Sequence, residues 1–570
     1  MTWRPPWRIT SSVTGPWVKS RPMPDESTFD YVIAGAGAAG CILAYRLAAE
    51  DGASVLLLEA GPSDNSWKVR MPRASREAYK EGSPFATWYR SEPQPNVDGR
   101  VLPYPRGIGL GGSASVNGMI FLRGHALDYE TWAQEGCRGW SYADVLPYYK
   151  RLEQADDGED AYHGRDGAVR VRMEQELGEL DAVFLEACRQ AGFPQTSDMN
   201  GRQQEGFGRF PLNIDDGVRA SSSYAYLVKR KRPAGLRIHT GAKACKILFE
   251  GKRAVGIDYL QGGTRRSVRA TREIILSGGA FGSPHLLLLS GIGPADELAA
   301  LGIKPVVDLP GVGRNLQDHT HVALQFECLK PVTLNGHLVA HRKVLLGLNW
   351  LLFRRGMGRS GSCVVGAFLC SPSETLHPNI ELQQFPILLR DGKLPPGEHG
   401  FRILTGPQRS DARGVVRLRS DNPQDHPAID PRYLSTERDR IEHREGYEIA
   451  RELVHQRAYD PYRGRSVEPA GEPRTKAEID AFVRQALATT HHVSGTCKMG
   501  ISEDAVVDPE LRVRGVEGLR VVDASVMPRV VSSNTNAATM MIAEKASDMI
   551  LRKPALTPEY ADYATRAELT

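Results

Sequence analysis

The sequence lacks long apolar runs, and this absence argues against a membrane-spanning helix. No stretch of the 570 residues approaches the roughly 18 apolar residues in a row that indicate such a helix. The N-terminus has no apolar core of about 7–15 residues, so it does not resemble a secretory signal. The eight cysteines form no CxxC pair, which argues against a disulfide framework and a zinc site. We therefore expect a cytoplasmic protein without a metal.

Acidic residues are missing from the first 22 residues, which carry four basic ones. The net charge of +4 belongs to this segment, because the rest of the chain has 68 basic and 68 acidic residues. A balanced body excludes a general nucleic-acid surface, which needs a clustered basic excess. We expect residues 1–27 to be an extension separate from the catalytic unit. It faintly resembles a transit peptide, or it results from an upstream start codon, since Met23 follows closely.

One apolar run, Val344–Phe353, is ten residues long and lies between Arg342-Lys343 and Arg354-Arg355. Such a run is typical of a buried helix or a substrate lid, and this is the interpretation that we favour. The alternative is a helix in a membrane interface with basic flanks at the lipid headgroups. The run is short for that role, so we expect peripheral membrane contact only as the less favoured alternative.

A nucleotide-binding pattern occupies the beginning of the body. A predicted strand, Phe29–Ala34, is followed at once by Gly35-Ala-Gly-Ala-Ala-Gly40 and then by apolar residues at helical spacing. A second apolar run, Val55–Leu58, ends in Glu59. This order is typical of a dinucleotide site, with glycines for the turn, the close phosphate approach and the helix–strand packing. The pattern fits FAD or NAD, and one unit at the start of the body favours FAD.

Four further motifs complete the pattern along the chain. Together with the nucleotide motif they closely resemble the glucose–methanol–choline (GMC) family of FAD-dependent oxidoreductases, over residues of about 29 to 552. The motifs are Tyr104-Pro-Arg-Gly-Ile-Gly-Leu-Gly-Gly-Ser-Ala-Ser-Val-Asn-Gly118, Ser277–Pro294, Gly311-Val-Gly-Arg-Asn-Leu-Gln-Asp-His319, and His492-Val-Ser-Gly-Thr-Cys-Lys-Met-Gly500 with Val522–Pro528 and Asn534 downstream.

The resemblance implies an α/β fold in which a Rossmann-type FAD-binding domain is interleaved with an α+β substrate-binding domain built on an antiparallel sheet. We expect the FAD domain to use residues 28–150, 216–312 and 492–553, and the substrate domain to use residues 151–215 and 313–491.

The resemblance also implies which residues bind the cofactor. Some relatives carry a histidine that links covalently to FAD, and Val116 matches that position here, so we predict non-covalent FAD. Ala244 would contact the adenine through its backbone. The predicted cofactor residues are Gly35, Gly37, Ala38, Ala39, Gly40, Glu59, Arg106, Gly112, Ser113, Asn117, Gly118, Ala244, Asp523, Ala524 and Asn536.

Two adjacent histidines, His491 and His492, compete for the role of catalytic base. Histidine suits proton abstraction near neutral pH. In the family pattern the base is followed by two variable residues and then Gly-Thr, which matches His492 in His492-Val-Ser-Gly-Thr. By the same resemblance Asn534 is its catalytic partner, which would hydrogen-bond the substrate oxygen. We predicted a structural role for His319, at a domain junction.

These groups predict oxidation of an alcohol, in our interpretation a primary one, with oxygen or a quinone as the electron acceptor. Choline is an alternative, but a quaternary ammonium needs aromatic faces, and His491 stands where choline-using relatives commonly have an aromatic residue. The substrate-side segment Ile380–Leu389 reads as a strand under the flavin, with Gln383, Phe385 and Ile387 on one face and Gln384 on the other. Its mixed face suits a neutral or moderately apolar alcohol. A lyase, a light-driven decarboxylase or a non-catalytic binding protein of the same fold remain as other hypotheses.

Overall fold

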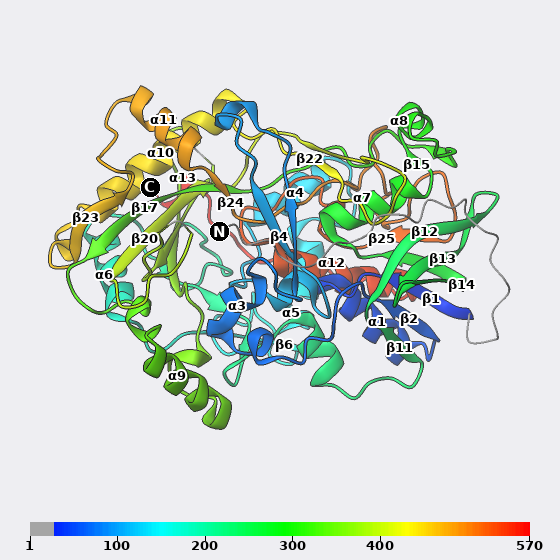
Figure 1. Cartoon of the computed structure of the whole chain (residues 1–570), viewed down its shortest axis with the longest axis horizontal. Coiled ribbons are helices and arrows are strands. Elements are labelled where there is room, and N and C mark those ends of the chain that lie inside the picture. The colour runs from blue at the N-terminus through cyan, green and yellow to red at the C-terminus, as the bar shows by residue number, and fades with distance from the viewer. Residues whose placement is uncertain (1–27, 375, 391, 570) are drawn as a thin grey trace, which may run out of the picture.

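The computed structural model describes residues 28–374, 376–390 and 392–569. The predicted extension 1–27, with its basic segment, therefore lies outside the described residues. Two large sheets lie at opposite ends of the long axis of the molecule, and helix α12 (Thr535–Ile550) runs through its middle (Figure 1).

The first sheet has seven strands in the order β11-β2-β1-β14-β13-β12, with β25 paired to β14. Strand β1 pairs in parallel with β2 and β14, whereas β12, β13 and β14 form an antiparallel extension. All four residues of β2 are buried, as expected for a parallel strand covered on both faces. The strands are β1 (Thr28–Ala34), β2 (Val55–Leu58), β11 (Leu236–His239), β12 (Ala242–Glu250), β13 (Arg253–Gln261), β14 (Thr264–Leu276) and β25 (Leu519–Val521).

Helix α1 (Ala38–Glu50) connects β1 to β2 and packs against α12. A buried ionic network joins these two helices. Arg46 of α1 pairs with Glu544 and Asp548 of α12, and its Nη2 lies 2.7 Å from Asp548 Oδ1. Because Arg46 would be costly to bury without these carboxylates, the network fixes the position of α12, which begins directly after Asn534.

The second sheet is antiparallel, in the order β23-β17-β20-β19-β18-β7, with β24 paired to β17. Helices α10 (Glu437–Val454) and α6 (Glu179–Gln190) pack against it. Its strands are β7 (Gly206–Arg209), β17 (Thr320–Cys328), β18 (Val365–Leu369), β19 (Ile380–Phe385), β20 (Gly400–Pro407), β23 (Arg463–Glu468) and β24 (Ala488–Thr489).

The remaining elements connect and cover the two sheets. The helices are α2 (Trp67–Arg70), α3 (Ser75–Tyr79), α4 (Ala126–Gln134), α5 (Tyr142–Leu152), α7 (Gly279–Leu289), α8 (Ala295–Ala300), α9 (Ala340–Phe353), α11 (Lys476–Ala486) and α13 (Arg566–Leu569). The shorter strands are β3 (Ala86–Arg90), β4 (Pro103–Gly107), β5 (Glu153–Ala155), β6 (Val169–Met173), β8 (Pro211–Leu212), β9 (Ile214–Asp215), β10 (Val218–Arg219), β15 (Ile292–Gly293), β16 (Val307–Asp308), β21 (Val415–Arg417) and β22 (Ala428–Asp430).

All strands of the first sheet fall within the segments that we assigned to the FAD domain, and all strands of the second fall within the substrate segments. The exact domain boundaries stay a prediction.

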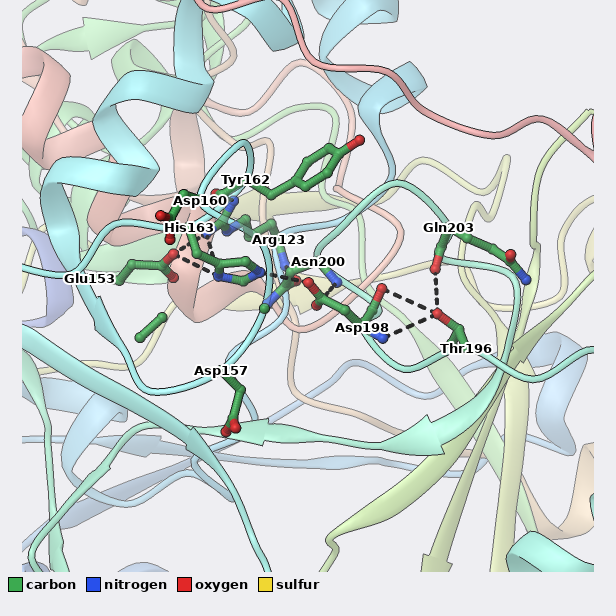
Figure 2. Close-up of polar contacts among 12 residues, drawn as sticks. Arg123, Glu153, Asp157, Asp160, Tyr162, His163, Thr196, Asp198, Asn200 and Gln203 are labelled. Atoms are coloured by element: carbon green, nitrogen blue, oxygen red, sulfur yellow. Dashed lines mark hydrogen bonds and ion pairs between the residues drawn. The ribbon is translucent and has the colours of Figure 1, made fainter.

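A buried polar cluster joins segments of both assigned domains. His163 lies between two carboxylates, with Nδ1 2.9 Å from Glu153 Oε1 and Nε2 2.7 Å from Asp198 Oδ2, and Arg123 also binds Glu153 (Figure 2). Burial favours the neutral ring, but these hydrogen bonds prevail and raise the pKa of His163.

Helix α9 corrects one prediction. The run Val344–Phe353 is helical, as expected, but it is not buried, since Trp350 is the only residue of α9 that is fully covered. No described element packs against its outer face, so the apolar side chains there meet solvent. Leu346 does line the cavity described below, which agrees with a lid. Within the described ranges no helix combines the length and the hydropathy needed to cross a bilayer.

A substitution at Gly40 tests whether the nucleotide turn is closely packed. A Cβ at this position would lie 1.9 Å from the backbone oxygen of Gly35. We therefore expect Gly40→Ala to lower the free energy of unfolding by about 3 kcal/mol or more, because a backbone atom cannot move aside cheaply. Thermal and urea unfolding would measure the change.

The matched control is Gly347→Ala within α9, where an added Cβ meets no atom within 4 Å. It should stabilise the protein slightly, by up to about 1 kcal/mol, through helix propensity. Equal midpoints for the Gly40→Ala variant and the parent would show that the turn is not tightly packed.

Candidate active site

A cavity of about 1040 Å³ extends from the nucleotide turn of the first sheet to the open face of the second. Both predicted catalytic residues, His492 and Asn534, line it. Of the predicted cofactor residues, all except Gly40 also line it, namely Gly35, Gly37, Ala38, Ala39, Glu59, Arg106, Gly112, Ser113, Asn117, Gly118, Ala244, Asp523, Ala524 and Asn536. The structure thus brings together segments that are up to about 500 residues apart in the sequence.

The turn after β1 is shaped for close backbone approach. Gly35 has a φ of +105°, and a Cβ there would lie 2.4 Å from the oxygen of Ser277. A Cβ on Gly112 would lie 2.8 Å from the Cα of Gly37. Helix α1 begins here without a side-chain cap, so its first amides have no side-chain acceptor. This arrangement fits the diphosphate of a dinucleotide.

Glu59 organises the loops around this turn. Its Oε2 accepts a hydrogen bond from the amide of Ala36 at 2.8 Å, and its Oε1 accepts from Gly61 and Gly109 at 2.8 and 2.9 Å. Burial outweighs these bonds and raises the pKa of the carboxyl group. The role of Glu59 as a cofactor-binding residue stays a prediction. The bonds to three backbone amides are a further role that the sequence did not indicate.

Asp523 has a similar role on the other side of the cavity. Its Oδ2 accepts from the amide of Gly279 at 2.9 Å and from Ser283 Oγ at 2.6 Å, and its Oδ1 accepts from the amide of Ser525 at 2.8 Å. The carboxylate therefore holds the start of α7 against the segment after β25. Ala524, next in the chain, faces the same cavity.

The two catalytic candidates contact each other directly. Asn534 Nδ2 lies 3.0 Å from His492 Nε2. An amide nitrogen can only donate, so Nε2 is the unprotonated nitrogen of a neutral ring. The proton then resides on His492 Nδ1, which lies 2.9 Å from His319 Nδ1. His492 consequently presents the lone pair of a base at the nitrogen beside Asn534.

His319 is therefore more than the structural residue that we predicted. It accepts the Nδ1 proton of His492, and the two rings meet edge to face, 5.1 Å apart and at 88°. The preceding residue, Asp318, accepts the backbone amide of His492 at 2.8 Å. The motif Gln317-Asp318-His319 was visible in the sequence, but nothing in it indicated a partner 173 residues away.

His491 is held in a strained conformation that orients its neighbour. Its φ of +66° lies in the left-handed region, which is unfavourable for a non-glycine residue. Thr489 Oγ1 accepts its amide at 2.8 Å, and Arg106 Nη1 donates to its carbonyl at 2.5 Å. The ring of His491 also lines the cavity, but only His492 is bonded to Asn534.

The open face of the second sheet forms the other wall. The strand that we predicted at Ile380–Leu389 is present as β19 (Ile380–Phe385), and Gln383, Phe385 and Ile387 line the cavity as expected. Gln384 points to the opposite side, where it accepts a bond from Tyr459. Arg402 of β20 lies opposite Phe385 and lines the same wall.

Burial keeps the histidines of the site neutral. It lowers the pKa of His492 well below its ordinary value, helped by the neighbouring His319, His491 and Arg106. The same cause lowers the pKa of other buried histidines, to about 4 for His125, His285 and His319, about 3 for His321, His443 and His491, and about 2 for His377.

These shifts predict acid sensitivity that begins near pH 6.5. Below that pH the unfolded chain binds protons on these histidines while the folded protein does not, so the free energy of unfolding falls as the pH falls. Buried carboxyl groups with raised pKa values oppose this trend. They include Glu59, Asp128 and Asp523, and burial raises the pKa to about 6 in Asp181 and Asp318 and to about 7 in Glu381. The histidines with lowered pKa values outnumber the three carboxyl groups whose raised pKa is about 6 or 7. Thermal unfolding between pH 7 and 5 should show a falling midpoint.

Replacing one buried histidine should weaken the dependence of the unfolding midpoint on pH. His443→Gln can keep the contact of 2.8 Å that its Nε2 makes with Thr320 Oγ1 and should flatten the acid slope. His455→Gln, at an exposed position, is the matched control and should leave the slope unchanged. An unchanged midpoint of the parent between pH 6.5 and 5 would contradict the expectation.

Comparison with known proteins agrees with the geometry. Two GMC oxidoreductase family models match residues 29–321 and 410–543. The chain is 46% identical to human mitochondrial choline dehydrogenase over 538 residues, covering 93% of this chain and 90% of the relative. It is 44% identical to the oxygen-dependent choline dehydrogenase of Vibrio vulnificus over 537 residues, covering 93% and 96%.

Solved structures agree as well. Pyridoxine 4-oxidase from Mesorbium loti superposes with a TM-score of 0.83 at 31% identity, covering 92% of this chain and 99% of that one. Formate oxidase from Aspergillus oryzae superposes with a TM-score of 0.87 at 24% identity, covering 93% and 99%, which supports the fold alone. The predicted fold class is confirmed. The chain belongs to the GMC oxidoreductase family and is an FAD-dependent enzyme that oxidises CH–OH groups.

Proposed function

We propose that this enzyme oxidises a neutral or anionic primary alcohol, with His492 as the base and Asn534 as the hydrogen-bond donor to the substrate oxygen. The observation that carries the proposal is the contact between His492 Nε2 and Asn534 Nδ2 in the cavity that also holds the glycine turn. A substrate hydroxyl placed beside this pair, within reach of both atoms, meets a proton acceptor and a donor at once.

When bound, FAD supplies the two-electron acceptor that takes a hydride from the alcohol carbon. The chain supplies the proton chemistry. His492 takes the hydroxyl proton at Nε2, and Asn534 Nδ2 turns its bond toward the developing alkoxide. The Nδ1–H of His492 stays bonded to His319, which holds the ring in the orientation that the transfer needs. Asp318 fixes the backbone of His492 by accepting its amide.

We further propose that FAD is held without a covalent bond. Val116 lines the cavity at the position where some relatives carry the linking histidine, and a valine side chain has no nucleophilic atom.

The proposed acceptor of the electrons is oxygen, with a quinone as the alternative. The name of the Vibrio vulnificus relative supports oxygen. We propose a cytoplasmic location, with mitochondria as the alternative because the human relative is a mitochondrial protein.

The charge of the cavity wall carries the proposal about the substrate. Within the described residues, the carboxylates that line the cavity are Glu59 and Asp523, which bind backbone amides near the nucleotide turn, and Asp425. On the substrate wall stands Arg402, whose Nε is buried without a partner and whose nearest carboxylate, Glu468, lies 3.8 Å away. A quaternary ammonium would be repelled there, whereas a neutral or carboxylate-bearing alcohol would be accepted.

Choline is the second candidate, because relatives named choline dehydrogenase share 44–46% of their residues with this chain. Tyr79 and Phe385 also line the cavity and offer aromatic faces to a cation. A substrate panel separates the two candidates.

Removing the base should slow reduction of the flavin by substrate. For His492→Ala we expect anaerobic reduction about 10²–10⁴-fold slower than in the parent, because a positioned base contributes about this factor. Stopped-flow absorbance of the flavin measures it. Acid precipitation of either protein should release the flavin, as non-covalent attachment requires.

The matched control is His491→Asn, because His491 directly precedes the base, lines the same cavity, and stands at a positive φ that asparagine tolerates. This variant should change the rate by less than about tenfold, since His491 makes no bond to Asn534. A His492→Ala variant that is reduced as fast as the parent would contradict the proposed mechanism.

The substrate proposal predicts that the parent enzyme has a higher kcat/KM for neutral or carboxylate-bearing primary alcohols than for choline. Arg402→Gln should lower kcat/KM for a carboxylate-bearing alcohol by about 10–100-fold, the usual cost of losing a charge-assisted bond, with little change for a neutral one. Arg266→Gln, on the exposed part of β14, is the control and should change neither. A parent that prefers choline by more than tenfold would overturn this proposal in favour of the second candidate.

A further inference from the structure

We propose that helix α9 and its basic flanks dock onto an anionic bilayer surface beside the entrance of the cavity. The observation is an apolar helix face that the fold leaves uncovered. In Figure 1, α9 projects at the lower left of the molecule, below the strands of the second sheet.

The apolar residues of α9 gather on one side. At 100° per residue they share a sector of about 120°, which is one face of the helix. These residues and their exposed fractions are Val344 (60%), Leu345 (63%), Leu348 (47%), Leu351 (57%) and Leu352 (67%), and Phe353 at the end of the helix adds 63%. A contiguous apolar ridge of this kind on a surface marks an interaction site.

The opposite side of α9 is firmly attached to the protein. Trp350 is 2% exposed, and its Nε1 donates a hydrogen bond of 2.6 Å to the carbonyl of Gly217. Leu346, one turn earlier on the same side, lines the cavity. The helix is therefore held in place by its inner side, and its outer side has no packing role within the described residues.

The charges around α9 determine which partner fits. The segment from Ala340 to Arg359 contains five basic residues and no acidic one. They stand just before and just after the apolar ridge, as expected for side chains that reach lipid headgroups while the ridge enters the acyl boundary. Lys343 also pairs with Glu77 at 3.2 Å, and Arg354 stacks over Trp350, so both remain at the rim of the ridge.

Two other occupants fit these charges less well. The segment 1–22 of this chain is itself basic, with four basic residues and no acid, so it would be repelled by the flanks of α9. A second copy related by a two-fold axis would bring two identical basic segments together. An anionic lipid surface complements the charge and accepts the apolar ridge at the same time.

Docking in this way would place the cavity entrance at the lipid surface. Leu338 and Met357, which precede and follow α9 in the chain, line the cavity together with Leu346. An apolar substrate or electron acceptor dissolved in the membrane would then reach the site without crossing bulk water. This inference does not depend on the charge of the substrate proposed above.

The test uses the full-length holoenzyme and lipid vesicles. Sedimentation with vesicles of phosphatidylcholine and phosphatidylglycerol (3:1) should carry the enzyme down, and pure phosphatidylcholine or 0.5 M NaCl should reduce the bound fraction severalfold. Leu348→Gln/Leu352→Gln should lower the apparent affinity for the anionic vesicles by at least tenfold. Turnover of a water-soluble alcohol should not change, because neither residue lines the cavity.

The matched control is Leu329→Gln/Ile501→Gln, which removes two side chains that are 67% and 70% exposed elsewhere on the surface. This control should bind vesicles like the parent. The proposal is overturned if the parent does not bind anionic vesicles, or if the α9 variant binds them as well as the control does. It is also overturned if light scattering shows a dimer that only the α9 variant loses, since a second copy would then be the partner.

Discussion

The contact between the two buried rings of His319 and His492 is the constraint on which the site depends. His319 must stay neutral, because the Nδ1 proton of His492 can be donated only to an unprotonated nitrogen, and His492 must stay neutral to keep the lone pair of Nε2 beside Asn534. Burial ensures this, since it lowers the pKa of His319 to about 4 and that of His492 further below its ordinary value. The contact also requires that the start of β17 meet the C-terminal segment, so it joins the two sheet regions at the proposed reaction site.

The position of Asn534, the second proposed catalytic group, depends on a different interaction. Asn534 stands directly before α12, and α12 is fixed by the buried pairs between Arg46 and the carboxylates Glu544 and Asp548. Arg151 of α5 adds a further pair to Asp548 at 2.7 Å. Because burying any one of these charges alone would be costly, the network allows a single placement of the helix. Two distant segments thereby present His492 Nε2 and Asn534 Nδ2 at hydrogen-bonding distance without a direct covalent connection.

The two ends of the cavity are built from different parts of the chain. The nucleotide end is built from backbone amides and glycines, which leave little freedom for variation. The substrate end is built from side chains of β19 and β20, where Arg402 stands opposite Phe385. Its charge separates this chain's proposed substrate from the substrate that gives the choline dehydrogenases their name, even though nearly half of all residues are identical. In this proposal a few wall positions set the substrate specificity, while the fold and the redox chemistry are shared with the family.

By itself the sequence determined the local features of this protein. The spacing of Gly35, Gly37 and Gly40 between two apolar runs predicted the first crossover, because turn geometry and strand burial depend on neighbouring residues. Motif spacing likewise selected His492 over His491. The tertiary structure alone decided the pairing with His319, 173 residues away, and the exposure of α9. An apolar helix pattern does not say which side a neighbour will cover, and a histidine's environment is set by whatever the fold packs around it.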